Sequence, residues 1–127
     1  MNKRQVGTTK EALAEKLLIL NGYEVIEKNY RCRKGEVDIV ASRDGYLIFV
    51  EVKYRKTKKY GLPMEAVDFK KQAVISAVSD VYRIHHKIPE DKKIRYDVVA
   101  ILGDTYKIIP NAFVYVSGIT SKSTRKY

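Results

Sequence analysis

Leucine and alanine recur at helical spacing near the N-terminus, in the segment 8–22. The apolar stripe consists of Leu13, Ala14, Leu17, Leu18 and Leu20. Thr8, followed three residues later by Glu11, has the pattern of a capping box, and Gly22 stands where a left-handed residue ends many helices. This pattern predicts a helix with one buried face.

A second helical pattern covers the segment 68–87, after a basic and proline-containing stretch. The residues expected on its buried face are Val74, Val78, Val81 and Tyr82. We therefore expect a second long amphipathic helix in the middle of the chain.

Five segments are rich in β-branched and aromatic residues, which is typical of strands. They span 23–31, 36–42, 46–53, 94–102 and 106–116. Asp44 and Gly45 form a strong hairpin signal between the second and third of them, and Pro110 interrupts the last. The order α-β-β-β-α-β-β predicts an α/β or α+β domain with one mixed β-sheet.

The hairpin predicts where the carboxylates of this sheet lie. A two-residue turn at Asp44–Gly45 places Asp38 directly opposite Glu51 and Glu36 opposite Lys53. Alternation then puts these four side chains on one face. The opposite face is expected to bury Val37, Ile39, Ile48, Val50 and Val52.

Two carboxylates on opposed strand positions lie roughly 5 Å apart at Cβ and repel each other. A divalent cation offsets that repulsion, because Mg²⁺ takes oxygen ligands from one or two carboxylates together with waters and substrate phosphate. Lys53 would stand beside the ion and orient a water, as in metal-assisted phosphodiester hydrolysis. The alternative is a solvated sheet face on which Glu36 and Lys53 form a cross-strand ion pair.

Several stretches together resemble a known family. "GTTKEALAEKLLILNGYEVIEKNYRCRKGEVDIV", "FVEVKYRK", "YGLPMEAV", "KKQ", "IRYDVVAI" and "PNAF" look like the YraN-like family of predicted endonucleases. These belong to the PD-(D/E)xK, or restriction-endonuclease-like, superfamily and are distantly related to archaeal Holliday-junction resolvases. The resemblance covers about Gly7 to Phe113.

The resemblance implies an α/β fold with a restriction-endonuclease-like core, in which a central mixed β-sheet is flanked by helices. It also implies a Mg²⁺ or Mn²⁺ site. Its ligands would be Asp38, Glu51 and the carbonyl oxygen of Val52, with Lys53 assisting the water. It also implies catalytic-site roles for Glu11, as an acid on the first helix, and for Glu36, in a "G-E-[IV]-D" pattern. Lys10 departs from the small residue that relatives often have before the helical acid.

Several of these residues have structural alternatives. Glu11 fits a helix cap as well as the surroundings of a metal. Lys71 and Gln72 are expected to contact substrate phosphate at a helix start, or to form a plain solvated first turn. Asp97 interrupts an apolar strand and is expected to be hydrogen-bonded structurally or to form an outer part of the site. His85 and His86, at a helix end, do not have the pattern of a zinc site.

Charge points to a polyanionic partner. The chain has 25 Lys and Arg against 15 Asp and Glu, a net charge of +10. We expect DNA, held mainly through its backbone with little base readout. The residues expected to contact it are Arg31, Arg33, Lys34, Arg55, Lys56, Lys58, Lys59, Lys71 and Gln72.

The remaining expectations concern organisation and location. Residues 1–116 are expected to form one domain, and 117–127 a mobile basic tail. The single cysteine, Cys32, fits a reducing cytoplasm, and no apolar run suits a signal peptide or a membrane span.

The favoured function is a metal-dependent DNA endonuclease that hydrolyses phosphodiester bonds, with structure-selective cutting of branched or junction DNA as one form. Symmetric cutting of a junction would require a homodimer. The alternatives are a non-catalytic nucleic-acid-binding module on the same fold and a basic adaptor protein.

Overall fold

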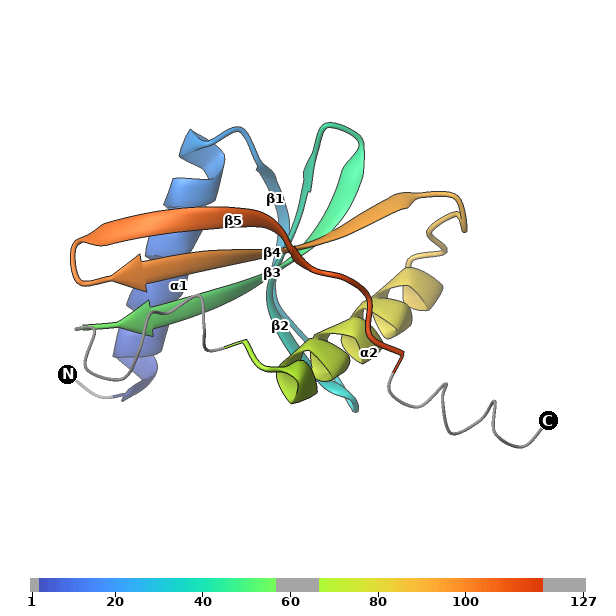
Figure 1. Ribbon diagram of the computed structural model, residues 1–127, viewed down its shortest axis with the longest axis horizontal. Coiled ribbons are helices and arrows are strands. Elements are labelled where there is room, and N and C mark those ends of the chain that lie inside the picture. The colour runs from blue at the N-terminus through green and yellow to red at the C-terminus, as the bar shows by residue number, and fades with distance from the viewer. Residues whose placement is uncertain (1–2, 57–66, 118–127) are drawn as a thin grey trace.

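The computed structural model describes residues 3–56 and 67–117, and its seven elements follow the predicted order (Figure 1). They are α1 (Lys3–Leu20), β1 (Glu24–Cys32), β2 (Gly35–Arg43), β3 (Tyr46–Arg55), α2 (Phe69–His85), β4 (Lys93–Leu102) and β5 (Thr105–Phe113). The strands form a mixed sheet in the order β1-β2-β3-β4-β5. Only β3 and β4 are parallel, because α2 connects them. The predicted α/β fold with a mixed sheet is confirmed.

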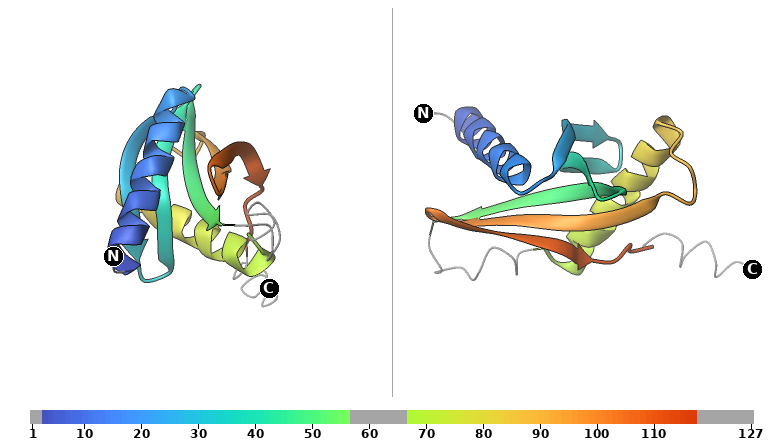
Figure 2. Two further views of the ribbon diagram at one scale, coloured as in Figure 1. Left: turned by 90° about the vertical axis from the view of Figure 1, so that its left-hand side faces the viewer. Right: turned by 90° about the horizontal axis from the view of Figure 1, so that it is seen from above.

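The two helices cover opposite faces of the sheet, as the views from the side and from above show (Figure 2). On one face, Ala14 and Leu18 of α1 pack against a cluster that includes Ile39, Val50 and Val99. On the other face, α2 packs against a cluster rich in aromatic side chains. Its members are Tyr30, Val37, Val40, Leu47, Phe49, Ile75, Val78, Tyr82, Tyr96 and Phe113.

Both helices differ in detail from the predicted faces. Leu13 and Leu20 are 41% and 76% exposed, so the buried stripe of α1 is narrower than its leucines suggest. In α2, Ile75 is buried while Val81 is only partly buried. The cause is that each helix meets the twisted sheet along a line set by its crossing angle, which periodicity alone does not give.

The helix boundaries bear on the site. α1 begins at Lys3, so Thr8 lies within the helix and the predicted capping box is wrong. Gly22, with φ of 92°, ends the helix as predicted. α2 is capped by Asp68, whose carboxylate accepts a hydrogen bond from the Lys71 N–H at 2.8 Å. This cap fixes the first turn of α2 beside the sheet.

The β2–β3 hairpin has the predicted register. Asp44 and Gly45 both have positive φ, of 52° and 83°, as a type I′ turn requires. Arg43 pairs with Tyr46, and the ladder continues to Ile39 opposite Val50. The turn therefore sets the alignment of the two strands that carry the candidate site.

Some predictions fall outside the described residues. These are Lys58 and Lys59 of the basic loop, and the predicted tail from residue 118 onward. Within the described part of the chain, no helix combines the length and apolar character needed to cross a membrane.

Candidate functional site at a fork in the sheet

The pairing of β2 with β3 runs from the hairpin turn to Ile39 and Val50, and beyond that pair the two strands separate. β3 remains paired with β4 as far as Arg55. In Figure 1, β3 runs to the left and the β1–β2 hairpin turns downward toward α2, so that the two strands form a fork. Separation leaves backbone groups of β3 without a strand partner on that side. The N–H of Val52 donates instead to the carboxylate oxygen Oδ2 of Asp38, at 2.8 Å.

The same geometry directs the carbonyl group of Val52 into the fork. In an antiparallel ladder the N–H and C=O of one residue point to the same neighbouring strand. Because the N–H of Val52 points toward Asp38, its carbonyl oxygen points there too. The fork thus collects a carboxylate from one strand and a backbone carbonyl from the other.

Asn29 of β1 lies beside the place where β2 and β3 separate. The β1–β2 register pairs Lys28 with Ile39 and Tyr30 with Val37, so Asn29 stands opposite Asp38. It has a left-handed backbone, with φ of 57°, which asparagine tolerates better than most residues. The strands therefore lose regular alternation here.

This irregularity corrects one sequence prediction. Val37 was expected on the same face as Ile39, but it packs with Val40 in the α2-side cluster, whereas Ile39 packs on the α1 side. Asp38 lies between these two positions, where the side chains change face. Its carboxylate points into the fork instead of onto a flat sheet face.

Asp38 and Glu51 meet in the fork. The ladder ends one pair before them, yet their side chains come close enough to interact. Burial first, and the neighbouring charge of Glu51 second, raise the pKa of Asp38 to about 7, against the opposing effect of the hydrogen bond from Val52. Glu51 is only 4% exposed. The structure thus brings together the two predicted acids.

Two lysines face the buried Glu51. The ammonium nitrogen of Lys53 lies 3.3 Å from its Oε2, and that of Lys71 lies 3.6 Å from the same oxygen. Lys53 comes from β3 itself, and Lys71 comes from the first turn of α2. Lys71 therefore belongs to the acidic site, and its approach to Glu51 excludes a plainly solvated first turn.

Glu36 does not pair with Lys53 as predicted. Its carboxylate lies 3.3 Å from the guanidinium of Arg31, its neighbour across β1 and β2. The predicted pair fails because β2 and β3 have already separated at this depth. The alternative of a solvated sheet face with a Glu36–Lys53 ion pair is therefore wrong.

Three carboxylates form a group at the mouth of the fork. Oxygens of Glu11, Glu36 and Asp38 all lie within 4.8 Å of one another. Glu11 reaches this place from the interior of α1, where its Oε1 accepts a hydrogen bond from Nδ2 of Asn29 at 3.2 Å. Its position within the helix excludes the capping role.

The donor set at the fork fits a hard divalent cation such as Mg²⁺ or Mn²⁺, which prefers carboxylate and carbonyl oxygens. Asp38 belongs both to the predicted ligand set, with Glu51 and Val52, and to the group with Glu11 and Glu36. The carboxylate oxygens of that group lie near enough to one another to share one ion or its bound waters.

The other predicted DNA contacts are spread around the fork. Arg31, Arg33 and Lys34 are exposed at the β1–β2 turn, and Lys56 is exposed after β3. Three further side chains are partly buried: Arg55, Lys71 and Gln72. Gln72 donates from Nε2 to the carbonyl oxygen of Val67 at 3.1 Å.

Asp97 has a structural role. It is fully buried and accepts hydrogen bonds from the Tyr23 hydroxyl (2.6 Å), from Nε and Nη2 of Arg95 (2.9 Å each) and from the Asn111 N–H (2.9 Å). Burial and the bond to Asp97 raise the pKa of Tyr23 to about 12. The structural alternative for Asp97 is confirmed.

Sequence reasoning missed three features of the site: the backbone conformation of Asn29, the approach of Lys71 to Glu51, and Lys107. Lys107 of β5 pairs with Ala100 of β4, which pairs with Lys53 of β3, so the two lysines stand in one row across the sheet. A basic residue in an edge strand is common, and only the pairing of β3, β4 and β5 shows this alignment.

Comparisons with known proteins identify similar chains of uncharacterised function. Residues 10–101 match the model of an uncharacterised protein family, UPF0102. A UPF0102 protein of Lachnoclostridium phytofermentans is 45% identical over 113 residues, covering 89% of this chain and 96% of that protein. Another, from Caldicellulosiruptor bescii, is 47% identical over 104 residues, covering 82% and 87%. A third, from Fusobacterium nucleatum, is 40% identical over 111 residues, covering 87% and 92%.

Proposed function

Since the chain belongs to the uncharacterised protein family UPF0102, the YraN-like family that its motifs resemble, we propose that it is a metal-dependent DNA endonuclease. The segment that matches the family spans Glu11, Asp38, Glu51 and Lys53. The proposal includes membership of the PD-(D/E)xK superfamily, with Asp38 as the first acid and Glu51–Val52–Lys53 as the E-x-K element.

One observation carries the proposal. The sheet opens at the point where Asp38 and Glu51 meet, and a lysine from the same strand touches the second acid. A protein that needed only a stable sheet would not gain from two adjacent carboxyl groups in a partly buried place, because their charges repel and burial penalises both. The adjacent carboxyl groups are explained if they bind a cation that also contacts a ligand, so that chemistry can take place on that ligand.

The residues divide the work of phosphodiester hydrolysis. Asp38, Glu51 and the Val52 carbonyl would hold a Mg²⁺ or Mn²⁺ ion, with Glu11 and Glu36 close to the same place. When bound, the ion supplies Lewis-acid stabilisation of the charge that develops on the phosphoryl oxygens. Lys53 donates hydrogen bonds that orient the attacking water, and its charge favours the more negative transition state.

Lys71 adds a second positive charge from the other side of Glu51. Its side chain is 38% exposed, so it can exchange its contact with Glu51 for a phosphate oxygen. The exposed basic residues of the β1–β2 turn would hold the DNA backbone nearby, and selectivity for branched or junction DNA would come from shape. A homodimer would allow symmetric cutting of both strands.

The test is cleavage of labelled four-way junction, flap, duplex and single-stranded DNA in Mg²⁺ and in Mn²⁺. Lys53→Ala removes the ammonium beside Glu51, and Lys16→Ala, on the exposed side of α1, is the matched control. We expect metal-dependent cutting that Lys16→Ala preserves and Lys53→Ala reduces by about 100-fold or more. DNA binding without cutting in either metal would instead favour the non-catalytic module.

A further inference from the structure

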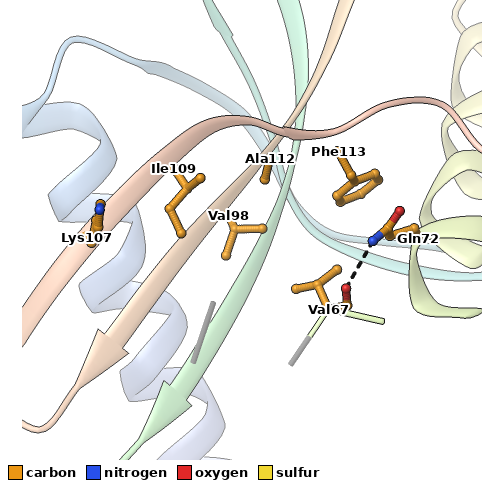
Figure 3. A pocket seen from close by; sticks show the side chains of 7 residues that line it. All are labelled: Val67, Gln72, Val98, Lys107, Ile109, Ala112 and Phe113. Atoms are coloured by element: carbon orange, nitrogen blue, oxygen red, sulfur yellow. Dashed lines mark hydrogen bonds between the residues drawn. The ribbon is translucent and has the colours of Figure 1, made fainter. Parts of the chain in front are cut away.

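A cavity of about 290 Å³ opens beside the fork, between the sheet and the first turn of α2 (Figure 3). Val67, Gln72, Val98, Lys107, Ile109, Ala112 and Phe113 line it. This volume lies just below the range for small-molecule pockets, about 300–1,000 Å³. The cavity therefore suits one compact ring system better than an extended ligand.

The cavity continues the candidate site across the sheet. Val98 of β4 pairs with Glu51 of β3 on one side and with Ile109 of β5 on the other. Neighbouring strands lie about 4.8 Å apart, so the cavity floor begins one strand away from the buried acid. On the α2 side, Gln72 directly follows Lys71, whose ammonium faces Glu51.

Glu51, Val98 and Ile109 thus form one row across the sheet, and a neighbouring row has a lysine at each end. It runs from Lys53 through Ala100 to Lys107, and places the two lysines about 10 Å apart on one face. Ala100 has only a methyl group, so no long side chain of this row stands between them. A phosphodiester chain crossing this row would meet one lysine at the fork and the other at the cavity.

The lining has the composition of a nucleobase pocket: apolar walls with a few polar groups. Val98, Ile109 and Phe113 form the walls (Figure 3). The Gln72 amide donates to the Val67 carbonyl, which fixes its orientation and turns its other end toward Phe113. A fixed amide can hydrogen-bond the edge of a base, while the apolar walls take its faces.

We propose that this cavity receives the base of an unpaired nucleotide adjacent to the phosphodiester bond held at the fork. A base in an intact duplex cannot enter a protein pocket without leaving its stack and its partner. The substrate class is then nucleic acid with an unpaired nucleotide beside the cut, such as a bulge, gap or branch point. The inference rests on the proposed nuclease function and specifies its substrate.

The first test compares cleavage of a fully paired labelled duplex with cleavage of a series of bulged duplexes. Each bulged duplex carries a single unpaired nucleotide, at a different position in each member of the series. Ala112 lies exposed on β5 and lines the cavity, so Ala112→Phe fills the cavity without disturbing the core. Val114→Phe adds a similar ring at a residue that is 74% exposed and outside the cavity lining.

We expect the wild type to cut the best bulged duplex about tenfold faster than the paired one, because unpairing is already complete. Val114→Phe should keep that preference, and Ala112→Phe should abolish it. Equal cutting of both duplexes by the wild type, or a preference that survives Ala112→Phe, would overturn the pocket while leaving the nuclease intact.

A second readout does not depend on cleavage. The same duplexes carry 2-aminopurine as the unpaired base, and its fluorescence reports transfer from water to an apolar pocket. We expect a change on binding to the wild type and to Val114→Phe, and none with Ala112→Phe. Binding without a fluorescence change at any position in the wild type contradicts the proposal, whether or not the DNA is cut. Absence of cutting with a cavity-dependent change would reject only the nuclease.

Discussion

Replacing Asp38 by Asn should remove a pH-dependent weakness of the fold. The pKa of Asp38 is raised to about 7 in the folded protein, from 3.8 in the absence of its surroundings. A carboxyl group with a raised pKa binds its proton more tightly when folded, so its contribution to stability is greatest below about pH 4 and is lost as pH rises through about 7. In metal-free buffer, the wild type should lose stability over this window.

The size of the stability loss depends on the pH range over which stability is measured. Between pH 5 and pH 8 the carboxyl passes through about two pKa units, each worth about 1.4 kcal/mol, which gives an upper limit of about 3 kcal/mol. Asp38 keeps some exposure to solvent, and the positive charge of Lys71 lies near it. We therefore expect a loss of unfolding free energy of about 1–2 kcal/mol. Asn keeps an oxygen that can accept the Val52 N–H, so that hydrogen bond need not be lost.

The assay is urea unfolding followed by circular dichroism at pH 5 and pH 8 with a chelator present. The loss of unfolding free energy between the two pH values should be about 1–2 kcal/mol smaller in Asp38→Asn than in the wild type. Asp44→Asn is the matched control, because Asp44 is exposed in the hairpin turn and Asn tolerates its positive φ. The same pH dependence in wild type and Asp38→Asn would refute the reasoning.

Three further predictions concern structure and metal. Asp97→Ala should lower the unfolding free energy by about 3–5 kcal/mol in urea titrations, because its arginine partner loses its counter-charge; a loss below 1 kcal/mol would contradict the central role of this carboxylate. Gly35→Ala should cost about 2–3 kcal/mol and more than Gly45→Ala, because a Cβ at Gly35 would lie 2.7 Å from Cγ1 of Val74, whereas the turn glycine has open space. Mg²⁺ at ten times its dissociation constant should stabilise the wild type by about 1.4 kcal/mol in thermal unfolding, and Asp38→Asn much less; equal stabilisation of both would place the ion elsewhere.

The hairpin explains why much of the site was predictable from the sequence. Asp44–Gly45 forms a two-residue turn, which fixes the register of β2 against β3 without any tertiary information. That register brings Asp38 toward Glu51, and their alternation with apolar residues gave the correct strand for each. The order of the helices and strands could be predicted equally well, because the hydrophobic periodicity of each element depends only on its own residues.

The fork itself was not predictable from spacing. Extrapolating the ladder past Ile39 gave a Glu36–Lys53 pair, which the structure replaces with Glu36–Arg31. The separation begins beside the left-handed backbone of Asn29, and a lone asparagine in a strand is too weak a signal to predict that conformation.

Features that depend on the crossover were also out of reach. The parallel pairing of β3 with β4 is set by the packing of α2, and no local turn specifies it. For this reason the row from Lys53 through Ala100 to Lys107 and the cavity beside it appear only in three dimensions. Lys71 was expected to contact phosphate from a helix start, but its contact with Glu51 requires the position of that helix against the sheet.

The most direct test of the central claim is the single-turnover cleavage rate of the best DNA substrate with Glu51→Gln, measured beside Glu24→Gln on the exposed part of β1. Glutamine keeps the shape of the side chain and removes the charge that Lys53 and Lys71 face. The account predicts a loss of about 100-fold or more in Glu51→Gln, with DNA binding within a few-fold of wild type and full activity in Glu24→Gln. Equal cleavage by all three proteins would contradict a catalytic fork and assign the activity to another source.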